Sequence, residues 1–152
     1  MTALCRKTES GLEFCNPADP RARRLLLAQG REVAHEVLGK AAAKLAIALL
    51  DTDRVAEAKS LLLSEITRSE KNIGDTNETT LALRLVYVDA LREDKPSLSD
   101  LVEAETIIED VEAKSRRLSG SDHPFTRGAK AKLEKVRLEV SRAAERRRRA
   151  GR

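Results

Sequence analysis

The chain has 152 residues, a formal net charge of +4, 36% charged residues and only 2% aromatic residues. The length fits one compact domain or a short array of repeats. The scarcity of aromatic side chains argues against a β-sandwich or β-barrel, because strands draw on aromatic and β-branched residues. Ala, Leu, Glu, Lys and Arg predominate instead, which is typical of an all-α protein.

The positive charge is concentrated at the C-terminus. Residues 142–152 contain six Arg and one Glu, which gives this stretch a net charge of +5. Because the whole chain carries +4, residues 1–141 carry −1. The isoelectric point of about 9.3 therefore reflects an Arg-rich tail rather than the rest of the chain.

The first predicted elements surround a turn with a helix cap at residues 16–20 (Asn-Pro-Ala-Asp-Pro), so we expect a short helix before it and a longer one after it. The apolar positions of the longer helix keep helical phase up to Leu50: Leu26, Val33, Val37, Ala41, Leu45 and Ala48. We predict one long helix that is weakened or kinked at Gly30 and Gly39, because each glycine costs ~1 kcal/mol relative to Ala. Two helices with a break at Gly39 are the alternative.

Paired helices follow in the middle of the chain. After the helix that ends near Leu50, we predict a partner helix over residues 55–73 and a second pair over residues 79–92 and about 100–118. In the second pair, Pro96 ends the connection, and Ser99 or Asp100 can cap the next helix. The predicted core positions recur at helical spacing: Val55, Ala58, Leu61, Leu62 and Ile66; Leu83, Val86, Tyr87, Ala90 and Leu91; Leu101, Ala104, Ile107, Ile108 and Val111.

A last helix is predicted to begin at Pro124, since proline is favoured at the first helical position. It runs through Val140 into the tail. The predicted organisation is a helical segment over residues 1–40, two helical hairpins and the start of a closing helix over 41–140, and an Arg-rich tail over 141–152.

An internal repeat links the two hairpins. Gly-led turns at residues 74–80 and 120–126 lie 46 residues apart. We expect Gly74 and Gly120 to end helices, because a left-handed backbone costs glycine little. Ala58 and Ala104 coincide at this offset, where two helices approach closely, so a bulky residue there should split the hairpin. Other coinciding pairs are Glu57 and Glu103, Ser69 and Ser115, and Thr80 and Thr126.

The sequence resembles the tetratricopeptide repeats (TPR) of kinesin light chains over about residues 41–140. The best match is Gly-Ser-Asp-His-Pro-Phe-Thr at 120–126, which contains His123 and Pro124; residues 54–58 and 100–104 match next. The turn at 74–78 lacks the His-Pro, the second hairpin has a longer loop, and the groove asparagines of the family have no counterpart. The resemblance implies a short right-handed α-solenoid of TPR-like repeats with flanking helices, which binds peptides or proteins on its concave face.

Three residues on the first helices of the repeats are candidates for this groove: Arg84, Val88 and Lys130. Arg84 and Lys130 coincide at the 46-residue offset, which predicts a basic stripe for an acidic or C-terminal carboxylate ligand. The alternative is an ordinary solvated helix face without a dedicated clamp.

Residues with catalytic or metal-binding chemistry are sparse. The dipeptide at 35–36 begins like a zinc-protease signature, but Gly39 stands where the second His is required. Cys5 and Cys15 fit no zinc pattern, so we expect free thiols. His123 is explained by the turn motif. We therefore expect no enzyme activity, no metal, no cofactor and no small-molecule substrate.

The expected function is a non-catalytic protein–protein interaction module whose partner is a peptide or protein. The alternative is a basic protein that associates with nucleic acid through the Arg tail; that tail could also be a nuclear localisation patch or a solvated helix end. No apolar run matches a membrane span and residues 1–7 lack a signal-peptide core, so we expect the cytoplasm, or the nucleus if the tail directs it there. Because repeat arrays need about three units, we expect the flanking helices to cap the stack; otherwise the chain belongs to a longer array or self-associates.

Overall fold

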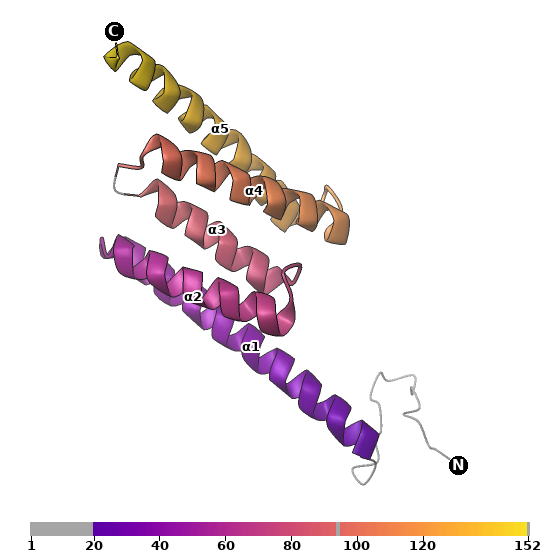
Figure 1. The fold of residues 1–152 in the computed structure, drawn as a ribbon. Coiled ribbons are helices and arrows are strands. Elements are labelled where there is room, and N and C mark those ends of the chain that lie inside the picture. The colour runs from indigo at the N-terminus through magenta and orange to yellow at the C-terminus, as the bar shows by residue number, and fades with distance from the viewer. Residues whose placement is uncertain (1–19, 94, 152) are drawn as a thin grey trace.

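The described chain is all-helical. The computed structural model describes residues 20–93 and 95–151, and these form five α-helices without a strand (Figure 1). The helices are α1 (Pro20–Asp51), α2 (Val55–Ile73), α3 (Glu78–Arg92), α4 (Leu98–Ser119) and α5 (Pro124–Ala150). The short helix, the two thiols and the leader segment considered above fall within residues 1–19, outside the described residues.

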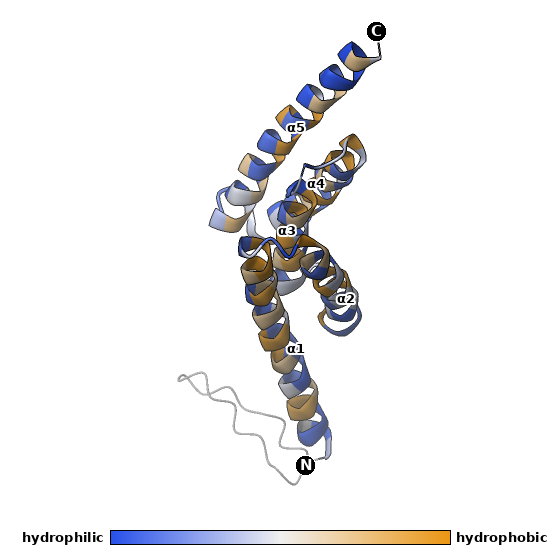
Figure 2. Ribbon diagram, turned by 90° about the vertical axis from the view of Figure 1, so that its left-hand side faces the viewer, coloured by the Kyte–Doolittle hydropathy of each residue, from blue (hydrophilic) through white to orange (hydrophobic). Residues whose placement is uncertain are grey.

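Each helix packs against the next one along the chain, and α1 also packs against α3. Helices α2 and α4 lie on one side of α3, whereas α1 and α5 lie towards its other side (Figure 2). The N-terminal half of α1 and the C-terminal end of α5 extend beyond the bundle at opposite ends (Figure 1). The arrangement is compatible with a helical repeat.

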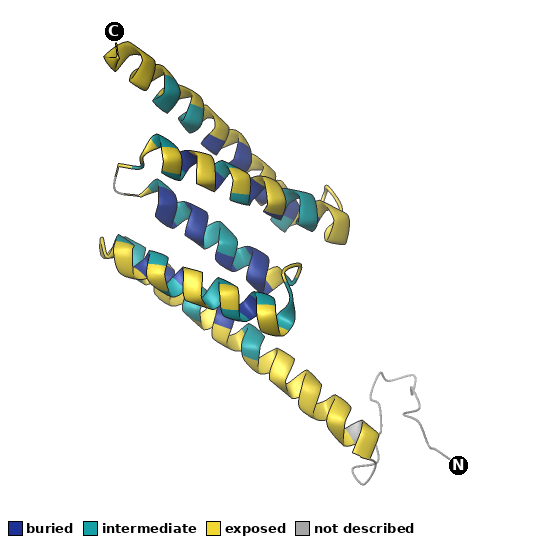
Figure 3. Ribbon diagram, in the orientation of Figure 1, coloured by how far each residue is buried: buried dark blue, intermediate teal, exposed yellow. Residues whose placement is uncertain are grey.

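Helix α3 lies at the centre of the core. More than half of its residues are buried, because α1, α2 and α4 all pack against it (Figure 3). The main core joins Leu62 of α2, Leu83 of α3, Ile108 of α4 and Val136 of α5, each with no exposed surface. Burying a side chain of this size contributes about 1.5–3 kcal/mol, so these contacts hold the four helices together.

Several residues that coincide at the 46-residue offset are buried at both positions. Ala58 and Ala104 are both fully buried, as the predicted close approach of helices requires. Further pairs that are buried at both positions are Leu62 and Ile108, Ser69 and Ser115, and Thr80 and Thr126. The sequence repeat is therefore also a repeat of local structure.

Glycine ends the second helix of each pair. Gly74 has φ 93° and ψ 158°, and Gly120 has φ 85° and ψ 167°, a region that residues with a side chain rarely enter. Each turn then leads into a side-chain cap of the next helix. Asn77 accepts a hydrogen bond from the Thr79 amide at 2.9 Å, and His123 Nδ1 accepts one from the Phe125 amide at 3.3 Å. Each Gly-led motif thus ends one helix and begins the next. Pro124 lies in the first turn of α5, as predicted.

The start of α4 differs from the prediction. Ser97, rather than Ser99 or Asp100, is the N-cap, and Asp100 completes a capping box. The Ser97 hydroxyl accepts from the Asp100 amide at 3.1 Å, and the Asp100 carboxylate accepts from the Ser97 amide at 2.9 Å. These bonds satisfy two backbone donors that the helix end leaves unpaired, so the helix begins earlier than predicted.

Helix α1 is continuous through Gly30 and Gly39, so the alternative of two helices is not observed. The apolar positions that predicted this helix do not face the bundle. Leu26, Val33, Val37 and Leu45 are each at least half exposed, whereas Gly39 and Ala46 are buried against the bundle. A Cβ on Gly39 would lie 2.6 Å from Thr79 Cγ2, so this glycine permits a close approach of α1 and α3. Small residues, rather than the Leu and Val stripe, face the neighbouring helices.

The Arg-rich segment is helical. Helix α5 continues to Ala150, so most of the segment predicted as a tail over residues 141–152 forms the last turns of this helix. Basic residues stabilise a helix C-terminus through its dipole, and Arg147, Arg148 and Arg149 occupy the last turn.

Candidate partner-binding groove

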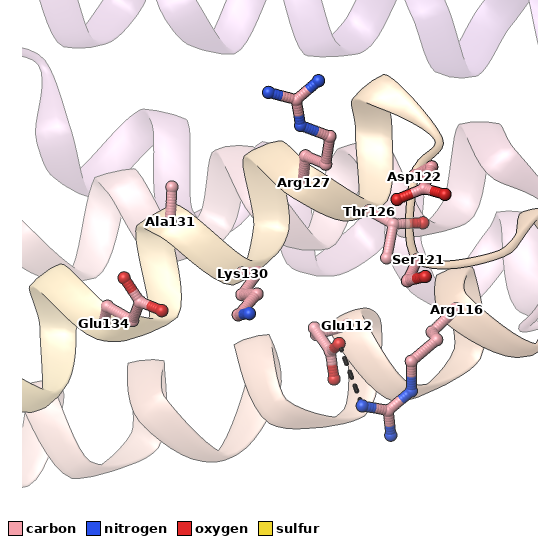
Figure 4. Close-up of a pocket in the computed structure, with 9 residues that line it drawn as sticks. All are labelled: Glu112, Arg116, Ser121, Asp122, Thr126, Arg127, Lys130, Ala131 and Glu134. Atoms are coloured by element: carbon pink, nitrogen blue, oxygen red, sulfur yellow. Dashed lines mark ion pairs between the residues drawn. The ribbon is translucent and has the colours of Figure 1, made fainter.

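A groove lies between α4 and α5, close to the turn that joins them (Figure 4). Its volume is about 530 Å³. It is lined by Glu112, Arg116, Ser121, Asp122, Thr126, Arg127, Lys130, Ala131 and Glu134. Because Gly120 ends α4 and His123 caps α5, the Gly-led turn places one end of this groove.

The Thr126 hydroxyl is an unsatisfied polar group in the wall of this groove. Thr126 is 2% exposed, and its Oγ1 has no hydrogen-bond partner among the described residues. In the first repeat, the matching Thr80 hydroxyl donates to the Gly74 carbonyl at 2.8 Å. The two repeats therefore differ at this position, since buried hydroxyls are normally hydrogen-bonded.

The charges of the groove are mixed. The lining contains three basic residues (Arg116, Arg127 and Lys130) and three acidic ones, of which Glu112 pairs with Arg116 at 3.3 Å. Lys130 is exposed and forms no ion pair within the described part of the chain. Its side chain points from α5 towards α4, whereas that of Arg127 points away (Figure 4). The groove can thus offer an ammonium group to an anionic ligand without first breaking an ion pair.

A second groove, of about 340 Å³, lies over α3 between α2 and α4. It is lined by Leu63, Ile66, Arg84, Tyr87, Glu103, Thr106, Ile107 and Asp110. Arg84 is 17% exposed and pairs with Glu70 at 2.7 Å and with Asp110 at 2.5 Å. Its charge is therefore already balanced by carboxylates of the two flanking helices.

The ion pairs continue along α4. Lys114 pairs with Asp110 at 2.7 Å and with Asp75 at 2.9 Å. The hydrogen bond from Lys114 is the main cause that lowers the pKa of the Asp75 carboxyl. At the other end of the groove, Tyr87 donates to Glu103 at 3.2 Å, and burial is the main cause that raises the pKa of its phenol. These contacts bind α2, α3 and α4 to one another.

The chain matches no protein-family model, no curated protein and no solved structure in the comparisons made.

Only part of the predicted groove is observed. Lys130 lines the α4–α5 groove, but Arg84 lines the α2–α4 groove, so the two do not form one shared stripe. Val88 was predicted to point into a groove; this is wrong, because it is fully buried in the core. Val88 lies on α3, which packs against α1, α2 and α4. Neighbouring helices therefore cover apolar residues on more than one side of α3.

Two half-buried residues near the C-terminus of α3 carry ionic links to α5 that the sequence pattern did not reveal. Asp89 accepts from Lys132 at 2.6 Å, and Arg92 donates to Glu139 at 2.7 Å. The hydrogen bond between them is the main cause that raises the pKa of Arg92 and lowers that of Glu139. The opposite charges at these positions were visible in the sequence, but their partners lie more than 40 residues away. Thr126 could also have been found from the sequence, because it coincides with Thr80 at the 46-residue offset.

His35, which begins the zinc-protease-like dipeptide, makes a contact between two helices. His35 Nδ1 lies 3.0 Å from Arg68 Nη1, which joins α1 to α2. No group of three or more potential metal ligands occurs in the described ranges 20–93 and 95–151. Over the same ranges, no helix combines the length and apolar character needed to cross a membrane.

Proposed function

We propose that this chain is a non-catalytic, TPR-like interaction module that binds a peptide or protein segment. The observation that supports this function is the match between the two hairpins: buried small residues, positive-φ glycines and capped helix starts recur 46 residues apart. Stacked hairpins with such a repeat generally present extended binding surfaces rather than reactive groups. In this proposal the helices form a short right-handed α-solenoid, with α1 and α5 as its flanking helices.

The α4–α5 groove is the proposed binding site. Lys130 provides an ammonium group without an ion pair, and Thr126 provides a buried hydroxyl without a hydrogen-bond partner in the described chain. A carboxylate, either at a peptide C-terminus or on an acidic side chain, is complementary in charge to the Lys130 ammonium group. The acidic residues of the groove, such as Glu134, favour a ligand that also carries a basic side chain.

Selection from a displayed library of short peptides tests this function. The affinity of a selected peptide is then measured by titration calorimetry for the wild type, Lys130→Glu and the matched control Lys135→Glu. Lys135 is exposed on the same helix but outside the groove, so both variants change the net charge equally. We expect Lys130→Glu to weaken binding by about tenfold or more, or ~1.4 kcal/mol, and the control to have little effect. Selection of no peptide, or equal losses in both variants, would contradict the proposal.

Nucleic-acid binding is the second candidate, and the geometry of α5 favours it. Arg142, Arg146 and Arg149 line one side of the projecting helix end, with Glu145 between them. Three arginines on one face can contact successive phosphates of duplex DNA. Each neutralised phosphate adds about −0.9 to the slope of log binding constant against log salt concentration. Changing all three arginines to Gln should abolish salt-dependent binding to duplex DNA and leave peptide binding intact. Peptide binding that disappears with DNA binding would instead place both functions on this helix end.

A further inference from the structure

Helix α1 carries an exposed apolar stripe on the side that faces away from the bundle. Val33, Val37 and Leu45 are 59%, 60% and 53% exposed. Exposed small residues lie on the same side and let another backbone approach closely: Gly30, Ala34, Ala41 and Ala48. The exposed Lys44 lies among them. Hydrophobic residues follow α1 along its length (Figure 2), and its N-terminal half is exposed (Figure 3).

The opposite side of α1 already has its neighbours. His35 contacts Arg68 of α2, and Gly39 lies against Thr79 of α3. The stripe therefore takes no part in packing within the described chain. Exposed, largely apolar faces of this length are uncommon on monomeric proteins and mark interaction sites.

The charges at the ends of α1 oppose its own helix dipole. Its first turn has no acidic residue and its last turn has no basic residue, although α2, α3 and α4 have both. Instead, Arg23 and Arg24 lie near the N-terminus, and Asp51 ends the helix; all three are exposed. Basic residues near a helix N-terminus and acidic residues near a C-terminus are unfavourable. An antiparallel neighbour of the same sequence relieves both ends, because it places each cluster beside the opposite charge.

We propose that α1 packs antiparallel against α1 of a second copy of this chain, about a two-fold axis between Val37 and Leu38. In this register, residues whose numbers add up to 75 lie level with one another. Gly30 then faces Leu45 of the second copy, and Ala34 faces Ala41. By symmetry this gives two central Ala–Ala pairs, with a Leu–Gly pair at each end of them.

The same register places Arg23, which lies on the stripe side of α1, within one residue of the level of Asp51 of the second copy. A parallel pair would instead align the arginine clusters with each other and superimpose the two helix dipoles. The two bundles do not collide, because each lies on the far side of its own α1. The stripe from residue 26 to 48 spans ~33 Å at 1.5 Å per residue, which offers a continuous helix–helix contact. This interface lies on α1, away from the α4–α5 groove, and does not depend on the proposed peptide binding.

Sedimentation equilibrium on the full chain tests the association. We expect a reversible dimer between about 1 µM and 1 mM, the range of dissociation constants for a modest interface. Val37→Glu places two carboxylates near the axis and should raise the dissociation constant more than about tenfold. Leu138→Glu is the matched control, since Leu138 is 51% exposed on α5. Unchanged circular dichroism spectra for both variants establish that the fold is retained.

Cysteine cross-linking tests the register, in a chain with Cys5→Ser and Cys15→Ser. Val37→Cys should form a disulfide with itself, because it lies beside the axis. Gly30→Cys and Leu45→Cys should cross-link with each other when mixed and not with themselves. Self-linking of Gly30→Cys would show a parallel pair and overturn the proposal. A wild-type chain that remains monomeric at 1 mM would also overturn it, and would leave this face to another segment of the chain or to a different protein.

Discussion

Two glycines of α1 offer a matched test of how closely this helix approaches the bundle. Gly39 is buried, and a Cβ built there would lie 2.6 Å from Thr79 Cγ2 and 3.6 Å from Leu83 Cδ1. Gly30 lies in the same helix, and a Cβ there would meet nothing within 4 Å. Replacing each glycine with alanine therefore makes the same chemical change in a crowded and in an open environment.

Gly30→Ala is expected to stabilise the protein, whereas Gly39→Ala is expected to leave its stability unchanged or lower it. Alanine favours a helix over glycine by ~1 kcal/mol at either position. At Gly39, the new methyl group is about 1 Å closer to Thr79 than the ordinary carbon–carbon separation of about 3.5–4.0 Å. Thr79 is β-branched and 5% exposed, so it has little freedom to move away. Overpacking of this kind costs ~1–3 kcal/mol, which equals or exceeds the gain in helix propensity.

Thermal unfolding followed by circular dichroism, at one low protein concentration, measures the difference. For a chain of this size each kcal/mol shifts the melting temperature by ~2–4 °C, so the Gly30→Ala protein should melt several degrees above the Gly39→Ala protein. Gly39→Ala should not exceed the wild type. If it stabilises the protein as much as Gly30→Ala does, α1 does not approach α3 as closely as described.

Four further predictions concern the contacts between helices and the cap of α5. Arg92→Gln should destabilise the protein by ~1–3 kcal/mol in urea unfolding, because it removes a partly buried charged hydrogen bond between α3 and α5; Arg54→Gln, in an exposed pair, should leave the midpoint nearly unchanged. Because the pKa of Glu139 is lowered in the folded state, its contribution to stability is complete above the ordinary glutamate pKa and is lost as the pH falls through the folded value. Acid titration of stability should show this loss in the wild type and a smaller one in Arg92→Gln. Ala104→Trp should lower the melting temperature sharply, and an unchanged value would argue against the α3–α4 contact. His123→Ala should cost ~1 kcal/mol through the lost cap of α5, whereas no change would show that the ring does not accept the amide bond.

The sequence predicted the helices from α2 onwards because strong local signals set their limits. Gly74 and Gly120 end helices in a conformation that favours glycine, and Pro124 begins α5. The prediction failed at Ser97, where two serines and an aspartate within four residues could each cap α4. Local sequence showed that a cap was present, but the hydrogen bonds decide which residue provides it.

Helix α1 was harder to predict because it has two apolar sides. The stripe that contains Val33 and Val37 has the larger side chains, and its spacing is what predicted the helix. The bundle contacts the side with Gly39 and Ala46 instead, because small side chains allow close packing of helices. Helical periodicity reports which residues share a face, but it does not report which face meets a neighbour.

The groove was predicted in part for a similar reason. The 46-residue offset placed Arg84 and Lys130 at matching positions, but α4 and α2 flank Arg84 and supply carboxylates to it. Lys130 has only α4 beside it in its groove and keeps an unpaired charge. Val88 is buried because α3 lies at the centre of the stack. Arg84, Val88 and Lys130 thus differ because their helices have different neighbours in the stack. The repeat pattern alone does not encode those neighbours.

Chemical-shift mapping with a library-selected peptide tests the proposed interaction module most directly. Amide resonances of the ¹⁵N-labelled chain are followed during the titration, in the wild type and in Lys130→Glu. The account predicts that the largest changes fall on residues that line the α4–α5 groove, including Thr126 and Lys130, and that they vanish in the variant. Changes centred on the arginines at the end of α5, or changes that persist in Lys130→Glu, would contradict it.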